Sequence, residues 1–445
     1  MAPPTSFLIT RWLVAVALID RIIEEGAKRA DETEVVLAEG VSVSADLKRR
    51  DISLATRSED CGLAIRVVWQ GRIGSSTSSD SRHWERCLDA AIASARMASM
   101  QPWGGFPGLS PGMPVVDELC FDPVVSLEPE AARRMLIDML DGASENPADV
   151  MSGSATLSLS TATIANSAGF RATSSHTGVS ISLEAIAGQS TGSEFAQSCF
   201  LEDVNPHSVG ERATFFASRS TNGKDIATGS YDIILSPIAY AELLSAAFVP
   251  ALSGRNVHAG RSRLATRLDQ LVLDTRFSLY DDPHIPKGLG SALWDGEGVP
   301  TKRIDFIDKG ILRSFAYDLR TAYRYGKKST ASAIRGGASG GTAIGHHNLI
   351  LDGPRSDISR EPAIYVHSVI GAHTANPMSG DFSVEMANAF FMEGGEFGEP
   401  IRSAMLAGNV FDMHTSVIGI SSEARQIGAL LLPSIRLSGL RVIGK

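Results

Sequence analysis

The sequence contains little cysteine and few aromatic residues. Of its 445 residues only 4 are cysteine, and aromatic residues make up 7%. The cysteines are Cys61, Cys87, Cys120 and Cys199. They have no CxxC spacing and are too sparse for a disulfide-stapled scaffold, which is typical of the reducing cytoplasm. We therefore expect a cytoplasmic protein, and we note that no cysteine follows Cys199.

Long hydrophobic runs and an excess of positive charge are also missing. The apolar run at 13–19 is much shorter than the about 20 residues that a membrane helix needs, and it lacks the basic flank of a signal peptide. The chain has 41 Lys and Arg against 50 Asp and Glu, a net charge of −9. A nucleic-acid binder needs a concentrated basic surface. We expect neither a membrane nor a nucleic acid as a partner.

The motifs of several common enzyme classes are absent. None of the 10 histidines is followed by glutamate, which excludes the HExxH zinc motif. There is no GxGxxG, and the one GxxxxGK match, at 439–445, leaves no helix to bind phosphate. Two GxSxG matches, at 108–112 and 337–341, lie in loops rather than between a strand and a helix, as a nucleophile elbow requires.

Two weaker kinds of site stay open. A non-standard metal site could use three histidines, His347, His367 and His373, although isolated histidines are more often structural. Carboxylates also occur in glycine-rich turns, where such side chains usually accept hydrogen bonds from nearby backbone N–H groups. These carboxylates are Asp281, Asp282, Asp295, Glu297 and Asp381.

Hydrophobic periodicity predicts an α+β fold with two domains. An N-terminal domain at 1–225 combines antiparallel strands with flanking helices, and a C-terminal domain at 226–445 is β-rich and mixed. Helices are expected at 13–29, 80–95, 128–140, 206–219 and 239–248. Strands are expected at 34–37, 41–45, 51–56, 62–69, 233–235, 304–312, 348–351, 363–370, 382–386 and 434–442. A break is expected at 71–74, and a long hairpin at 155–188 turns at 166–169.

The order of short motifs resembles the TldD/PmbA (TldE) family, described both as modulators of DNA gyrase and as peptidases. The resemblance runs from about Glu25 to Val442. The segments that carry it are 67–78 (VVWQGRIGSSTS), 235–237 (LSP), 252–255 (LSGR), 281–283 (DDP), 295–301 (DGEGVPT), 310–312 (GIL), Gly371, 376–377 (NP), 379–383 (SGDFS) and 408–410 (GNV). An acidic chain without basic patches does not favour direct binding to DNA.

The resemblance implies which kind of family member this chain is. The TldD kind resembles a zinc metallopeptidase with HExxxH on a helix and a cysteine ligand further along the chain. Here the two histidines of that motif fall on Ser245 and Pro250, and its glutamate on Ala246. The cysteine is missing as well. The chain therefore resembles the PmbA/TldE kind, and we expect no catalytic residues, metal or cofactor in it; zinc is expected on a TldD-like partner.

The resemblance also implies a role in proteolysis. A TldE-like chain pairs with a TldD-like catalytic subunit, or with itself, and unfolded peptide is cleaved in the enclosed space. Candidate residues of a peptide groove are His373, Asp381, Gly337, Ser339 and Gly340. Two alternatives remain: an active hydrolase with a divergent site, and a homodimeric peptide-binding protein without catalysis.

Overall fold

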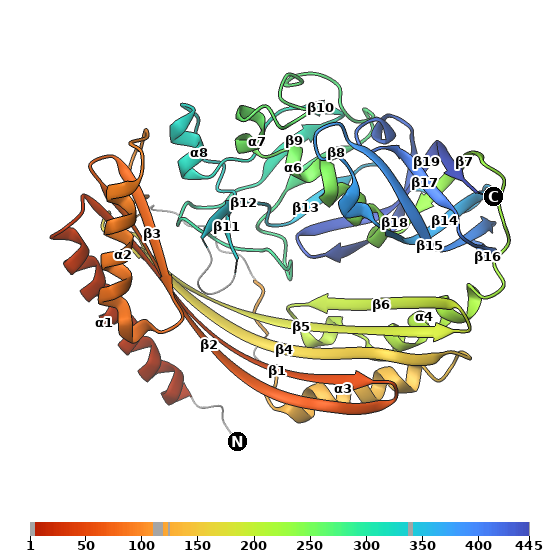
Figure 1. Cartoon of the computed structure of the whole chain (residues 1–445), viewed down its shortest axis with the longest axis horizontal. Coiled ribbons are helices and arrows are strands. Elements are labelled where there is room, and N and C mark those ends of the chain that lie inside the picture. Colours follow the sequence, from red (N-terminus) through yellow and green to blue (C-terminus); the bar gives the residue numbers. More distant parts are fainter. Residues whose placement is uncertain (1–4, 110–118, 123–124, 337–340, 445) are drawn as a thin grey trace.

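The computed structural model describes residues 5–109, 119–122, 125–336 and 341–444 of the chain. It is an α+β molecule in which a long curved sheet lies against a second, β-rich body (Figure 1). The chain crosses from the first sheet to the second body between Arg219 and Gly229. The predicted fold class, antiparallel strands with flanking helices followed by a mixed β-rich part, is confirmed.

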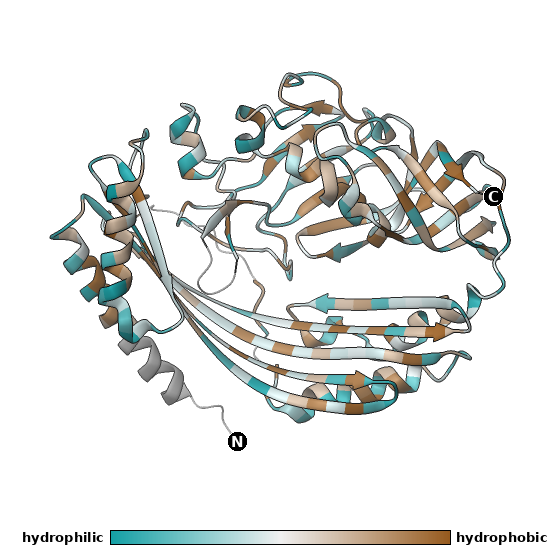
Figure 2. Cartoon of the chain, viewed as in Figure 1, coloured by the Kyte–Doolittle hydropathy of each residue, from teal (hydrophilic) through white to brown (hydrophobic). Residues whose placement is uncertain are grey.

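The first sheet has six antiparallel strands in the order β3-β2-β1-β4-β5-β6. Their bounds are β1 (Glu32–Lys48), β2 (Asp51–Trp69), β3 (Arg72–Ser78), β4 (Asp149–Asn166), β5 (Arg171–Ala187) and β6 (Ser190–Ser198). The predicted hairpin with a turn after Asn166 is confirmed as β4 and β5. Hydrophobic and polar residues alternate along these strands in Figure 2, as expected for strands with different environments on their two faces.

Three local predictions in this sheet were wrong. The runs 34–37 and 41–45 form one strand, β1, and the runs 51–56 and 62–69 form β2. The break expected at 71–74 is a turn at Gln70 and Gly71 followed directly by β3. The reason is tertiary: β1 is paired along nearly its whole length with β2 on one side and β4 on the other, and this pairing overrides weak local propensity.

Helices cover one face of the sheet. They are α1 (Thr5–Ala27), α2 (Trp84–Met97), α3 (Pro129–Gly142) and α4 (Pro206–Arg219). The short turn η1 (Ser81–His83) precedes α2, and the short turn η2 (Leu201–Asp203) precedes α4. Because side chains alternate along a strand, the odd-numbered residues of β1 all face these helices: Val35 and Leu37 pack with α1 and α2, and Val43 packs with α3. Even-numbered Glu34 and Val36 face the second body instead.

The second body is built on an eleven-stranded mixed sheet. Its strands are β7 (Gly229–Leu235), β8 (Ser278–Asp281), β9 (Ile304–Asp308), β10 (Ile311–Leu312), β13 (Leu349–Asp352), β14 (Ala363–Ile370), β15 (Asp381–Glu393), β16 (Glu396–Ile401), β17 (Met405–Asn409), β18 (Val417–Ile427) and β19 (Leu430–Ile443). β7 pairs with both β14 and β19, so the ladder β19-β17-β15-β14-β7 closes on itself. A separate hairpin joins β11 (Ala333–Arg335) to β12 (Thr342–Ile344).

Short helices complete this body. They are α5 (Pro237–Leu243), η3 (Leu244–Phe248), α6 (Val249–Ala251), α7 (Gly254–His258), α8 (Leu319–Arg324), η4 (Ala372–Thr374) and η5 (Asp412–Thr415). The main core of the body surrounds α5 and η3, where Tyr240, Leu243 and Phe248 are almost completely buried.

Two further observations concern the cysteines and the membrane. Cys120 and Cys199 form a disulfide that the sequence did not predict, while Cys61 and Cys87 are free. The disulfide ties the segment at 119–122 to the end of β6. No helix among the described residues is long and apolar enough to cross a membrane.

We expect Gly210→Ala to destabilise the protein. Helices α3 and α4 cross so closely that a Cβ at Gly210 would lie 1.8 Å from the backbone oxygen of Met139. Because the Met139 backbone cannot move aside as a flexible side chain can, the free energy of unfolding should fall by about 1–3 kcal/mol. Urea unfolding measures the loss. Gly336→Ala is the matched control, because a Cβ there meets nothing within 4 Å; equal stability of the two variants would contradict the prediction.

Candidate functional site

The helix on which the family resemblance places the metal motif follows directly after β7. The Ser236 hydroxyl caps it by accepting hydrogen bonds from the N–H groups of Ile238 and Ala239, and Pro237 occupies the first turn. The helix was predicted at 239–248. Its second half is a π-helical turn, η3, closed by the Val249 N–H donating to the Leu244 carbonyl five residues earlier.

The π turn changes which side chains share a face. In an α-helix, residues five apart lie about 140° apart around the axis. The i→i+5 hydrogen bond of a π turn instead brings residue i+5 above residue i. The π hydrogen bond joins Leu244 and Val249, the positions just before Ser245 and Pro250, so we expect positions 245 and 250 to be turned toward similar sides. The exposed Ser245 and the half-buried Ala246 and Pro250 all belong to this stretch.

These residues do not fit a zinc ion. Ser245, Ala246 and Pro250 offer neither imidazole nor carboxylate. The nearest carboxylate on the helix, Glu242, accepts a hydrogen bond from the Val369 N–H at 3.0 Å, and burial raises its pKa. Among the described residues, no group of three or more His, Cys, Asp or Glu side chains could hold a metal ion.

The alternative metal site built on histidines is not assembled. The His347 ring lies between the carbonyl oxygens of Gly290 and Ala331 at 3.1 and 3.0 Å. His367 stacks on Phe216, with ring centroids 3.8 Å apart, and its burial lowers its pKa to about 4. His373 is exposed on η4. Each ring is therefore held in its own environment, as isolated histidines usually are.

The predicted groove residues fall in different places. His373 lies on η4, which packs against α5 and η3, so it is near the degenerate helix. Asp381 is exposed at the start of β15, where a hydrogen bond from Asn409 at 2.7 Å, and one with Ser379, lower its pKa. Gly337, Ser339 and Gly340 lie outside the described residues, as does Ser110 of the other GxSxG match. The prediction that these residues line a peptide groove stays a prediction.

A pocket of about 500 Å³ opens between the curved sheet and the second body. One wall is the sheet face that carries Val36 of β1, Ile164 of β4, and Ser174 and His176 of β5. The other wall comes from the second body, with residues 292–296 and Arg335, the last residue of β11. Leu119 and Phe121, beside the disulfide, close one side. Much of the lining is apolar, and burial lowers the pKa of His176, which keeps its ring neutral.

A buried ionic network joins the two walls of this interdomain pocket. Glu34 and Arg66 are directly opposite each other on β1 and β2, and the Arg66 guanidinium donates to the Glu34 carboxylate at 2.7 Å. Its other terminal nitrogen donates to Glu297 of the second body at 2.5 Å. Arg335 donates to the second oxygen of Glu34 at 2.6 Å. Burial lowers the Arg66 pKa, but the charges of Glu34 and Glu297 outweigh burial and raise it.

Asp295 is a fifth ionisable group beside this ionic network. Its carboxylate accepts hydrogen bonds from the N–H groups of Glu297, Val299 and Ala333, which confirms the expected role of acidic residues in this turn. Burial, and then repulsion from Glu297, raise the pKa of Asp295 to about 8 despite those bonds. With its pKa at about 8, Asp295 adds no charge to the network at neutral pH.

Sequence reasoning missed Glu34 and Arg66. Both sit inside otherwise apolar strand runs, 34–37 and 62–69, and a charged residue in such a run is a signal of a buried ion pair. That signal does not name the partner, because Glu297 lies 231 residues from Arg66 in the chain.

Three parts of the chain match models of the successive domains of one protein family. Residues 228–444 match the PmbA/TldA metallopeptidase C-terminal domain, residues 122–221 its central domain and residues 33–95 its domain 1. An uncharacterised protein of Methanocaldococcus jannaschii is 28% identical over 425 residues, covering 95% of this chain and 99% of the relative. Metalloprotease PmbA of Escherichia coli O157:H7 is 24% identical over 461 residues, covering 95% of each chain.

A solved structure shares the fold. The crystal structure of TldE from Thermococcus kodakarensis superimposes with a TM-score of 0.86 at 24% identity, covering 96% of this chain and 100% of that chain.

We expect Arg66→Met to destabilise the protein strongly. The substitution keeps the side-chain stem but leaves the Glu34 and Glu297 carboxylates buried without their shared cation. Breaking a buried pair in this way costs about 3–5 kcal/mol of unfolding free energy. Arg303→Met is the control, because Arg303 forms an exposed pair with Asp305, a kind worth about 0–1 kcal/mol. Similar losses for the two variants in urea unfolding would argue against the network.

Asp295 should make stability fall as pH rises. Its pKa is about 8 when folded and close to 4 when unfolded, so between these values the folded state holds a proton that the unfolded state has released. The contribution of Asp295 to the free energy of unfolding is complete below about pH 4 and is lost as the pH rises through 8. Asp295→Asn removes this titrating group, so the free energy of unfolding of the variant should fall less between pH 5 and pH 8. Urea unfolding at roughly one-unit pH steps measures the difference. An unchanged slope would contradict the raised pKa; Asp305→Asn is the exposed control.

Proposed function

This chain belongs to the PmbA/TldD metallopeptidase family, and from that premise we propose that it is a peptide-binding subunit without its own zinc centre. In this proposal a TldD-like chain carrying HExxxH supplies the zinc and the cleavage chemistry, and the present chain helps to hold unfolded peptide. The observation that carries the proposal is the residue set at the helix after β7.

The helix supports a loss of metal binding on an otherwise retained scaffold. In this proposal the π turn brings positions 245 and 250 toward one side, as a pair of ligands five residues apart requires. The side chains at these positions, a hydroxymethyl group and a proline ring, cannot act as histidine does. Glu242 cannot take the place of the missing glutamate without giving up its hydrogen bond to Val369.

The interdomain pocket supports peptide binding by this chain. Pockets of about 300–1,000 Å³ at domain interfaces, mainly apolar with a few oriented polar groups, are the usual form of a ligand site. Here Phe121, Ile164 and Trp294 offer apolar contacts, and Ser174 offers a hydroxyl group. A neutral His176 and a protonated Asp295 add hydrogen-bonding groups without charge. Such a lining suits the backbone and uncharged side chains of an extended peptide.

The chain purified alone from zinc-supplemented cells should contain much less than one zinc per chain by plasma mass spectrometry. It should cleave unfolded peptide only after an HExxxH-bearing relative is added, because the reacting centre lies on that chain. Stoichiometric zinc in this chain, or chelator-sensitive cleavage by it alone, would overturn the proposal in favour of an active hydrolase. Peptide binding with no activity in the mixture would favour a homodimeric binding protein.

Restoring the motif tests whether the scaffold has kept its geometry. We expect the triple variant Ser245→His, Ala246→Glu, Pro250→His to bind Co²⁺ on the order of tenfold more tightly than the parent chain, because both imidazoles would face one side. The visible absorption of bound Co²⁺ is the readout. Ser245→His alone is the control. Equal affinities of the triple and single variants would show that positions 245 and 250 do not converge.

A further inference from the structure

A disulfide lies beside the interdomain pocket. Cys120 and Cys199 are joined although they are 79 positions apart in the chain, and both are buried. Cys199 directly follows β6, the edge strand of the curved sheet, whereas Cys120 belongs to the segment 119–122, which is part of no helix or strand. The bond therefore attaches an irregular segment to the end of a paired strand.

The segment 119–122 forms part of the pocket wall. Leu119 and Phe121, the two neighbours of Cys120, both line the pocket, and Phe121 is 43% exposed. The position of these two side chains depends on where the backbone of Cys120 is held. The disulfide therefore bears directly on the shape of the pocket, whose other lining residues come from the sheet and the second body.

Hydrogen bonds also attach the segment to the sheet. The Thr177 N–H donates to the Cys120 carbonyl at 2.9 Å, and the Asp122 N–H donates to the Thr177 hydroxyl at 2.7 Å. The Leu201 N–H donates to the Asp122 carboxylate at 2.9 Å. Each such bond contributes little net free energy, because water offers the same groups other partners. The disulfide is the covalent link among these contacts, and its removal leaves the segment more weakly held.

The surroundings of the two sulfur atoms also suit free thiols. The Cys120 sulfur lies 3.7 Å from the carbonyl oxygens of Thr177 and Leu289, and the Cys199 sulfur lies 3.9 Å from that of Gly288. A thiol is a weak hydrogen-bond donor, so after reduction each buried S–H finds an acceptor already in place. Sparse cysteines are typical of reducing compartments, where disulfides are usually redox-sensing or catalytic rather than structural.

We propose that the Cys120–Cys199 pair is a redox switch for the interdomain pocket, an inference that rests on the proposed function of this pocket as a peptide site. In the oxidised chain the bond holds Leu119 and Phe121 in place, so a peptide meets a wall that is already ordered. In the reduced chain the two sulfur atoms separate, and the irregular segment moves more easily than the paired strand. The reduced chain therefore binds peptide more weakly.

Glutathione, a small thiol, can drive the switch by thiol–disulfide exchange. A first glutathione thiolate attacks one sulfur, and the S–S bond breaks to leave a mixed disulfide and one cysteine thiolate. A second glutathione thiolate attacks the mixed disulfide and releases glutathione disulfide and the other cysteine thiolate. Two glutathione molecules thus supply both electrons, and the two protons they lose end on Cys120 and Cys199. Because both sulfurs are buried, exchange should be slow.

Peptide binding in the two redox states tests the proposal. The labelled, uncharged peptide acetyl-Thr-Val-Phe-Ser-Val-Thr-Gly is titrated with the full chain by fluorescence anisotropy, once after oxidation in air and once in dithiothreitol. The reduced chain should bind on the order of fivefold more weakly, because the peptide must then order the wall itself. Thiol titration in denaturant identifies the states: the oxidised chain has only the free thiols of Cys61 and Cys87.

Cysteine variants locate the effect. Cys120→Ala combined with Cys199→Ala should bind as weakly as the reduced chain with or without dithiothreitol. Cys61→Ala combined with Cys87→Ala is the matched control and should keep the full difference. Phe121→Ala retains the disulfide and changes an exposed side chain, so it does not depend on the folding of a chain without the bond. It should bind weakly and respond less to reduction.

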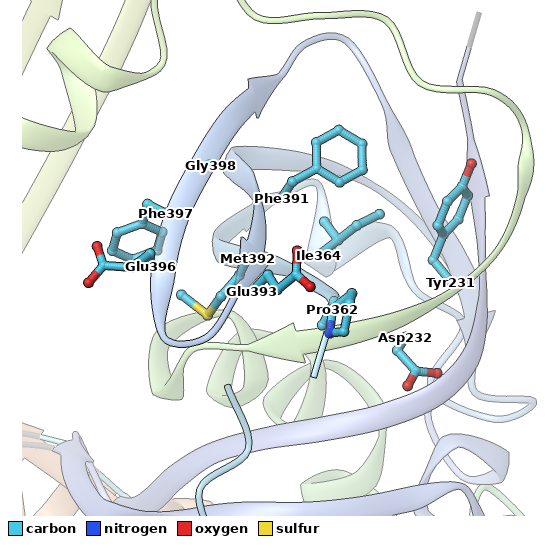
Figure 3. Close-up of a pocket in the computed structure, with 11 residues that line it drawn as sticks. Tyr231, Asp232, Pro362, Ile364, Phe391, Met392, Glu393, Glu396, Phe397 and Gly398 are labelled. Carbon is cyan, nitrogen blue, oxygen red and sulfur yellow. The ribbon is translucent and has the colours of Figure 1, made fainter. Parts of the chain in front are cut away.

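Hydrogen exchange measures the switch without any peptide. Reduction should speed the exchange of backbone amides at 119–122. The β15–β16 hairpin is the internal reference, because it lies at the far end of the second body, beside a separate pocket of about 400 Å³. Figure 3 shows residues that line that pocket, among them Tyr231 on β7 and Phe391 and Phe397 on the hairpin. The exchange of the hairpin should not change.

The outcomes separate this inference from the proposed function. Equal or tighter binding by the reduced chain, with thiol titration confirming both states, would overturn the switch and leave the peptide site intact. A disulfide that dithiothreitol does not reduce in the folded chain, or unchanged exchange at 119–122, would also overturn the switch alone. Absence of peptide binding in both states would overturn the proposed function, and the switch with it.

Discussion

One guanidinium, that of Arg66, joins the two halves of the molecule. It lies between a carboxylate of its own sheet, Glu34, and a carboxylate of the second body, Glu297. Taking such charges out of water is costly, and the cost is recovered only with close pairing and full hydrogen bonding. The curved sheet must therefore meet the second body in one register, in which Arg335 completes the network on Glu34. The position of the interdomain pocket, and of Trp294 within it, follows from that register.

The helix after β7 illustrates the difference between main-chain geometry and side-chain chemistry. Its capping serine, its first-turn proline and its π turn are features of main-chain geometry, and they are all present. The chemistry of a metal site depends on a few side chains, and those of Ser245, Ala246 and Pro250 offer neither imidazole nor carboxylate. A family fold at 24% identity to a solved relative thus fixes the scaffold and leaves the activity to the residues of the site.

The charges beside the interdomain pocket limit what it can bind. In the interdomain pocket the charges are paired and buried, so the surface offered to a ligand is close to neutral. This arrangement suits contacts that tolerate many peptide sequences.

The sequence by itself determined the fold class, the hairpin of β4 and β5, helix α4 and the absence of metal ligands at 245, 246 and 250, because periodicity, turn residues and motif positions are local properties. It did not reveal that β1 and β2 are continuous, since their pairing along both edges overrides weak local propensity. It could mark Glu34 and Arg66 as charges in apolar runs, yet not that Glu297 meets them. Only the tertiary structure decided the interdomain pocket, the Cys120–Cys199 disulfide and the raised pKa of Asp295, because each depends on distant residues brought together by folding.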